Sequence, residues 1–104
     1  MLEQARQIAD LLKMLANENR LLIFCALMDA PMTVGDIAKK VPNIRQSALS
    51  QHLTLLRAAG LLSSEKAGQN VIYSIADTRV NELIHVLKKC YCDGNSNEKG
   101  ETSR

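Results

Sequence analysis

The sequence predicts a mainly α-helical fold with a small β-hairpin, in the order of a winged helix-turn-helix domain. The expected order is four helices, two strands and a final helix. Residues 45–63 combine an apolar stripe at helical spacing with a polar opposite face. A capped helix that stops at a proline precedes them, and two short strand-like runs follow. Helix, turn, polar-faced helix and hairpin in this order are typical of a winged helix-turn-helix module.

The chain has the size of one domain, at 104 residues. We expect residues 1–92 to form that domain. Residues 93–104 hold no apolar side chain larger than a threonine methyl group, which predicts a disordered tail. No signal peptide and no apolar run near the roughly 18 residues that span a bilayer are present, so we expect a cytoplasmic protein with no membrane partner.

The N-terminal helix carries an apolar stripe. With no Trp, one Phe and two Tyr, the core must be mainly aliphatic, and a small domain of this kind often gains stability by dimerising. We expect the stripe and the last helix to form a homodimer interface, while the stripe also serves the chain's own core. The predicted interface residues are Ile8, Leu11, Leu12, Leu15, Leu83, Ile84 and Leu87.

A further helix is predicted to start at Thr33. The Thr33 hydroxyl can cap it, and Asp36 in the first turn resembles the acidic partner of a capping box. The helix should end near Pro42, because proline disfavours helical geometry at Val41 and removes an amide donor.

The helix from Gln46 to Ala59 is the most informative element. Leu49, Leu53 and Leu56 form its inner side, and Gly60 supplies the stop because glycine readily adopts the left-handed conformation. A short helix that is apolar behind and polar in front suits the DNA major groove. The alternative is an ordinary amphipathic surface helix. The polar side carries Gln46, Ser47, Ser50, Gln51, Thr54 and Arg57.

Two strand-like runs, Leu61–Lys66 and Asn70–Ile75, flank the three-residue connection Ala67–Gln69 and predict the hairpin. The net charge of +2 is too small to indicate nucleic acid by itself. The distribution of charged residues is more informative, because several Lys and Arg residues and no acidic residue lie between Ile37 and Ser64. An acid-free basic stretch favours phosphate contacts, although a solvated basic face is the alternative.

Three segments resemble the ArsR/SmtB family of bacterial repressors. Residues 47–62 (SALSQHLTLLRAAGLL) resemble the family's recognition helix, residues 15–27 its second helix, and residues 71–75 its second wing strand. The match covers roughly residues 5–92, with the motifs in the family's order. The resemblance implies a homodimeric transcription regulator that binds an inverted-repeat DNA operator and leaves it when an inducer acts.

This resemblance, together with the polar helix face, predicts which residues meet DNA. We expect the side chains from Ser47 to His52 to lie nearest the bases, Arg45 and Arg57 to contact phosphates, and the wing tip to add further contacts. The predicted DNA-binding residues are Arg45, Gln46, Ser47, Ser50, Gln51, His52, Arg57, Lys66, Gln69 and Asn70.

The metal-binding motifs of the family are missing at two places. Metal-sensing members carry Cys-x-Cys in the third helix, where this chain has Val34–Ala38 without a thiol. They carry Asp-x-His and His-x-x-Glu in the last helix, where this chain has Asp77-Thr-Arg79 and His85 followed by Lys88. We therefore expect no metal and no cofactor, although other metal arrangements exist in the family.

The three cysteines are Cys25, Cys90 and Cys92. By itself, Cys25 on the apolar side of its helix is typical of a packing residue. The resemblance, however, extends to a sulfide- and redox-responsive branch (BigR-, SqrR- and HlyU-like regulators) that pairs such a cysteine with one at the end of the last helix. It implies a switch in which reactive sulfur species or an oxidant bridge Cys25 and Cys92. Helical spacing instead turns Cys90 inward, so Cys90 stays open as the partner.

The sequence leaves three other functions open. One is a metal-responsive repressor that uses Cys90 and Cys92 as a soft-metal site, but residues two apart on a helix point about 200° apart. The second is a thiol redox enzyme that uses the same pair and has no role on DNA. We do not expect an enzyme, because the sequence has no Ser/His/Asp constellation, phosphate loop or zincin motif. A winged helix that binds only protein is a third possibility.

Overall fold

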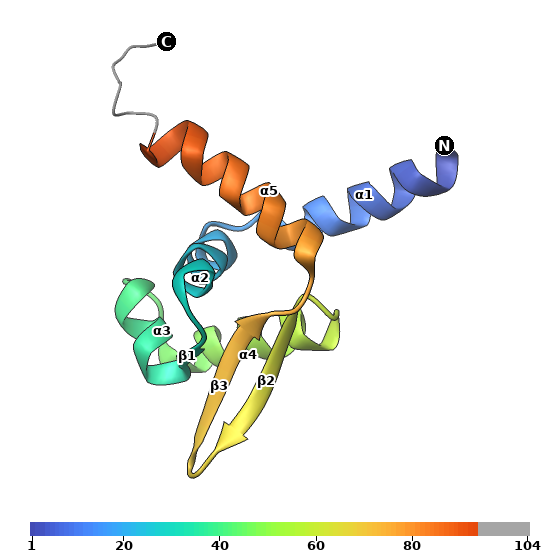
Figure 1. The fold of residues 1–104 in the computed structure, drawn as a ribbon. Coiled ribbons are helices and arrows are strands. Elements are labelled where there is room, and N and C mark those ends of the chain that lie inside the picture. Colours follow the sequence, from blue (N-terminus) through green and yellow to red (C-terminus); the bar gives the residue numbers. More distant parts are fainter. Residues whose placement is uncertain (94–104) are drawn as a thin grey trace.

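The structure, a computed structural model, describes residues 1–93 of the chain and the side chains of residues 1–91. The predicted tail therefore lies almost wholly outside the described residues. The predicted order of helices and hairpin is confirmed (Figure 1). The elements are α1 (Leu2–Leu15), α2 (Glu18–Asp29), β1 (Met32–Thr33), α3 (Val34–Lys40), α4 (Gln46–Ala58), β2 (Leu62–Ala67), β3 (Asn70–Ile75), α5 (Thr78–Lys88) and the π-helical turn η1 (Lys89–Asp93).

The sheet has one strand more than predicted. Strand β1 pairs antiparallel with β3, so that Met32 lies opposite Tyr73, and the strand order is β1-β3-β2. A strand of two residues is too short to show the alternation by which strands are recognised in a sequence. It links the start of α3 to the middle of β3, at Ile72 and Tyr73.

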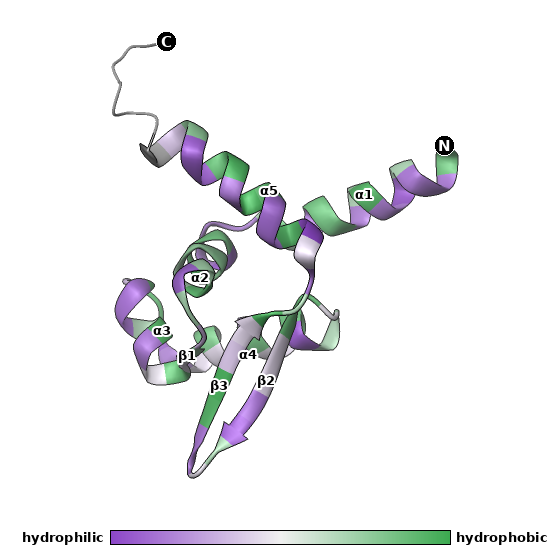
Figure 2. Ribbon diagram, in the orientation of Figure 1, coloured by the Kyte–Doolittle hydropathy of each residue, from purple (hydrophilic) through white to green (hydrophobic). Residues whose placement is uncertain are grey.

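The hairpin of β2 and β3 forms the wing. Its register runs from the pair Leu62–Ile75 to the pair Ala67–Asn70, which leaves a loop of Gly68 and Gln69. The predicted three-residue connection was therefore one residue too long. Gly68 has a φ of 66°, as the first loop position of a type II′ turn requires. The far ends of both strands are hydrophilic (Figure 2).

Side-chain caps fix where three helices begin. The Asn17 Oδ1 atom accepts hydrogen bonds from the backbone amides of Asn19 and Arg20 at the start of α2, at 2.9 and 3.1 Å. The predicted cap of α3 is confirmed, since the Thr33 hydroxyl accepts from the Asp36 amide at 3.2 Å. The Asp77 carboxylate caps α5. Each cap satisfies amide donors that a helix start leaves unpaired.

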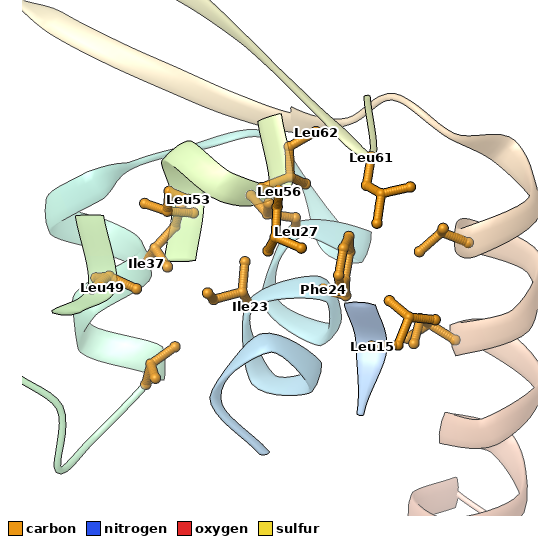
Figure 3. Packing of buried hydrophobic residues seen from close by; sticks show 13 residues of the cluster. Leu15, Ile23, Phe24, Leu27, Ile37, Leu49, Leu53, Leu56, Leu61 and Leu62 are labelled. Carbon is orange, nitrogen blue, oxygen red and sulfur yellow. The ribbon is translucent and has the colours of Figure 1, made fainter. Parts of the chain in front are cut away.

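The core lies where α2, α3, α4, α5 and the base of the wing meet (Figure 3). Leu49, Leu53 and Leu56 are fully buried, which confirms the predicted inner side of α4. They pack in one cluster with Phe24 from α2 and Ile37 from α3. This packing leaves the opposite side of α4 in solvent.

Two residues predicted for the dimer interface belong to the monomer core instead. Leu15 at the end of α1 and Ile84 on α5 are only 4% and 2% exposed, because both side chains pack into the core cluster. The rest of α1 projects from the body (Figure 1), and Ile8 and Leu12 are 56% and 48% exposed. Leu87 is also exposed. No helix in the described part of the chain is long and apolar enough to cross a membrane.

Candidate DNA-binding surface and thiol site

The outer face of α4 presents a row of polar side chains. Ser47, Ser50, Gln51 and Thr54 are exposed, as the helical spacing predicts. A surface hollow of about 410 Å³ runs along this face and is lined by Ser50, Gln51, Thr54, Leu55 and Ala58. Leu55 is 44% exposed on this face, although it was not among the predicted DNA-binding residues. Helical spacing could have placed Leu55 on the outer face, because it follows Gln51 by one helical turn.

His52 lies beside this row and not in it. Its side chain is half-buried, and its Nδ1 atom accepts a hydrogen bond of 3.2 Å from Nε of Arg20 on α2. Burial lowers the pKa of His52 below its usual value, and the positive charge of Arg20 lowers the pKa further. His52 was predicted to lie near the bases, but one of its two ring nitrogens, Nδ1, is occupied by this contact within the protein.

Basic residues surround the polar row. Arg45 occupies the N-cap position of α4, and Arg57 lies in its last turn; both are exposed. Lys66, Gln69 and Asn70 are exposed at the end of the wing, as predicted. Because α4 itself carries no acidic residue, its outer face combines hydrogen-bonding groups with positive charge. Such a face can meet both base edges and phosphates.

An apolar cavity adjoins Cys25. The Cys25 side chain is half-buried and packs against the core cluster. The cavity, of about 380 Å³, lies between α2 and the end of α5 and is lined by Leu21, Cys25, Ile84, Leu87, Lys88 and Tyr91. Lys88 also pairs with Asp29 at the end of α2, with 3.9 Å between Nζ and Oδ1. The end of α5 is therefore held close to the helix that carries Cys25.

The inward orientation expected for Cys90 is wrong, because its side chain is exposed. The helix α5 ends at Lys88, and residues 89–93 form a π-helical turn. A π turn places more residues in each turn than an α-helix, so it rotates the residues after Lys88 away from the stripe of Val80 and Leu83. The side chain of Cys92 lies outside the described part of the chain, and its pairing with Cys25 remains a prediction.

No group of three side chains suited to a metal lies among the described residues. The Cys90–Cys92 metal site depends on the Cys92 side chain and falls outside them. The described residues do provide a capped helix, a turn, an exposed polar helix and a wing whose tip is polar. These features define a winged helix-turn-helix protein of the DNA-binding class.

Comparison with known proteins gives the family. Residues 17–64 match the model described as bacterial regulatory protein, arsR family. The transcriptional activator HlyU of Vibrio cholerae is 44% identical over 85 residues, which cover 82% of this chain and 78% of that protein. The regulator YgaV of Escherichia coli is 40% identical over 88 residues, covering 85% and 89%. The chain belongs to the arsR family of bacterial regulatory proteins.

Solved structures agree with this assignment. Reduced HlyU from Vibrio cholerae superposes with a TM-score of 0.83 at 40% identity, covering 88% of this chain and 96% of that one. The transcriptional repressor BigR from Xylella fastidiosa has a TM-score of 0.79 at 28% identity, covering 88% and 93%. The predicted family is confirmed, and the chain is a DNA-binding transcription regulator. It is not a thiol redox enzyme.

Proposed function

We propose that this regulator acts in the cytoplasm as a homodimer that binds an inverted-repeat operator and is released by thiol chemistry at Cys25 and Cys92. The inducer is a reactive sulfur species or an oxidant. One observation carries the switch: Cys25 and Tyr91, the residue before Cys92, line the same cavity.

DNA reading is supported by the exposed face of α4. Ser47, Ser50 and Gln51 lie on one side of a helix whose other side is buried, so they can reach base edges in the major groove. Arg45 and Arg57 are exposed at the two ends of the helix, which supports their contact with the phosphates on either side. The wing tip supplies Lys66 for the backbone of the neighbouring groove. Gln46, Gln69 and Asn70 extend this surface, and Leu55 can contact a thymine methyl group.

Dimerisation is supported by apolar side chains that the monomer leaves in solvent. Ile8 and Leu12 on α1 are about half exposed, and so is Val86 on α5, at 54%. Leu11 and Leu83 are half-buried beside them. Burying such side chains between two copies is favourable by about 25 cal/mol per Å². Two recognition helices related by a two-fold axis then match an operator with half-sites about one helical turn apart.

The thiol chemistry needs two cysteines within reach of each other. A direct disulfide requires the Cα atoms of the two cysteines to lie within about 7 Å of each other. Tyr91 lines the same cavity as Cys25, and Cys92 is the next residue, about 3.8 Å further along from Cα to Cα. Lys88 lines this cavity too and supplies a positive charge that favours a thiolate.

The steps of bridge formation are as follows. One thiolate attacks the outer sulfur of an organic persulfide, RSSH, and the thiol RSH leaves. The second thiolate attacks the new cysteine persulfide and expels hydrogen sulfide. A single S–S bond then joins the two cysteines, and the persulfide has accepted their two electrons. The bridge ties α2 to the end of α5, which also carries part of the proposed dimer surface.

The test is DNA binding to the region upstream of the regulator's own gene, before and after treatment with an organic persulfide. Wild type and Cys90→Ser should bind and then release. Cys25→Ser and Cys92→Ser should bind and stay bound. If release survives the loss of Cys25, the two-thiol switch is the wrong mechanism. If release requires Cys90 and not Cys92, the bridge uses the other thiol.

A further inference from the structure

We propose that Arg20 is a positioning residue for DNA recognition, which fixes the rotation of α4 through the neutral ring of His52. The inference rests on the proposed use of α4 to read DNA. It assigns His52 the role of a hydrogen-bond acceptor within the protein, in place of a base-reading residue.

The guanidinium group of Arg20 joins three helices. Its Nε atom donates to Nδ1 of His52 on α4 at 3.2 Å, and its Nη1 atom donates to the backbone carbonyl oxygen of Met14 on α1 at 3.1 Å. Arg20 and His52 are 32 residues apart in the sequence. Their bond is therefore a tertiary contact between α2 and the recognition helix, and the same side chain reaches the helix proposed for dimerisation.

Arg20 is well placed to impose an orientation because its own backbone is fixed. It lies in the first turn of α2, and its amide donates to Oδ1 of the capping residue Asn17 at 3.1 Å. Both Arg20 and His52 are half-buried. If either side chain is removed, the polar group of the other is left half-buried without this hydrogen bond, which is unfavourable.

A directional contact adds to the orientation that the three buried leucines of α4 already give the helix. The inner face of α4 is made of Leu49, Leu53 and Leu56, and apolar burial depends on area rather than on angle. A hydrogen bond weakens steeply when its angle departs from linear. The Arg20–His52 bond therefore restricts rotation of α4 about its axis. Gln51 is the neighbour of His52 in the chain, so this rotation sets where Gln51 points.

The bond also specifies the protonation state of His52. Arginine only donates, so Nδ1 must be unprotonated and the ring proton of the neutral form must be on Nε2. Protonation of His52 would remove the acceptor and place two cations together. The charged group that faces the ring is Arg20 from α2, and the Met14 carbonyl oxygen of α1 accepts from the same guanidinium group. The lowered pKa of His52 agrees with this arrangement.

The first experiment needs no DNA. Titrating the ring of His52 by NMR in wild type and in Arg20→Met compares its pKa with and without the donor, because methionine keeps apolar length but donates no hydrogen bond. His85, the other histidine of the chain, serves as the internal control. We expect the pKa of His52 to rise in Arg20→Met, because the positive charge of Arg20 lowers it in wild type. An unchanged pKa of His52 would overturn the proposal.

The second experiment separates a positioning role from base reading by two matched substitutions. The amide oxygen of His52→Asn can take the place of Nδ1, whereas the longer His52→Gln places its amide near the position of Nε2. We expect Arg20→Met and His52→Gln to lose operator affinity on the order of tenfold, as the loss of one hydrogen bond to a charged group predicts. His52→Asn should stay within about threefold of wild type, since it keeps the acceptor.

The dependence of operator affinity on pH distinguishes this positioning role from a purely structural one. As the pH falls below the ordinary histidine pKa of about 6.5, the operator affinity of wild type should fall relative to that of His52→Asn, because only wild type loses its acceptor on protonation. If His52 reads a base through Nε2, His52→Gln will keep its affinity, His52→Asn will lose it, and Arg20→Met will bind normally. That pattern contradicts the proposal while leaving the DNA-reading role of α4 intact. Failure of wild type to bind any operator would instead count against the proposed function.

Discussion

At the scale of single residues, the exposed face of α4 carries two kinds of side chain that meet DNA differently. Gln51 can form a paired hydrogen bond to a base edge, which carries sequence information. Arg45 can neutralise a phosphate, which fixes the position of the protein without reading sequence. Both side chains are exposed, so substitution of either should leave the core unchanged.

We expect Gln51→Ala to lose sequence preference, at about 1–3 kcal/mol for a good base contact. Arg45→Ala should weaken binding to operator and to unrelated DNA alike, and should reduce the dependence of affinity on salt by about one counterion. Competition binding at several salt concentrations measures both effects. Unchanged affinity and selectivity in Gln51→Ala would show that Gln51 does not read a base.

Several residue roles could be predicted from sequence because helical spacing determines them. Leu49, Leu53 and Leu56 share one face by spacing alone, and Thr33 is recognisable as a cap from the residues that follow it. The bond between Arg20 and His52 could not be found in this way, because it joins side chains that only the folded chain brings together. Cys90 was placed wrongly because no local signal marks the π turn that begins at Lys89.

At the scale of elements, the start of α5 depends on Asp77. Its carboxylate accepts from the backbone amide of Arg79 at 2.8 Å, and from the Arg79 guanidinium at 3.1 and 2.6 Å. The hydrogen bonds from the Arg79 side chain are the main cause of a lowered pKa for Asp77, against the opposing effect of burial. The cap therefore holds the helix that carries part of the proposed dimer surface and the thiol turn.

The lowered pKa gives the cap a definite pH dependence. Because the folded pKa lies below the unfolded value, the charge of Asp77 contributes stability above about pH 4, and this contribution is lost as the pH falls through the folded pKa. Asp77→Asn keeps a capping oxygen but does not titrate. Its free energy of unfolding should be lower than that of wild type at pH 7, and the difference should shrink below pH 4.

Denaturant unfolding at several pH values measures this difference. As a control, Asp77→Ala should cost more than Asp77→Asn at pH 7, since it loses the cap altogether, at about 0.5–2 kcal/mol. A difference between wild type and Asp77→Asn that is the same at pH 3 and pH 7 would show that the charge of Asp77 contributes nothing.

The order of elements followed from periodicity and from turn residues, but their details did not. The hairpin was predictable because Gly68 lies between two strand-like runs. Its loop was assigned one residue too many, because only the hydrogen-bond register shows that Ala67 pairs with Asn70. Strand β1 was missed because two residues carry no pattern.

At the scale of the whole molecule, the apolar stripe of α1 has two roles. Leu15 belongs to the core, whereas Leu12 one turn earlier is half exposed. The sequence showed the stripe but could not divide it between the core and a partner subunit, because both surfaces are apolar. The structure makes this division residue by residue and thereby provides a matched pair for a test of the dimer.

Leu12→Glu should split the dimer while leaving the subunit folded, because the carboxylate stays in water in the monomer and loses its hydration only in the interface. Leu15→Glu should instead unfold the chain, since the charge would enter the core. Sedimentation at micromolar concentration together with circular dichroism distinguishes the two outcomes. A Leu12→Glu protein that sediments as the same dimer as wild type would place the interface elsewhere.

The most direct test of the regulatory account is the operator affinity of one protein sample in its reduced and bridged forms. Cys90→Ser is the suitable background, because it leaves only Cys25 and Cys92 to react. The bridge is verified by intact mass, as the loss of two hydrogens or the gain of further sulfur. We predict that bridging lowers operator affinity by about 5–150-fold, the usual range of allosteric coupling, and that a reductant restores it. Equal affinity of the reduced and the fully bridged protein would contradict the account.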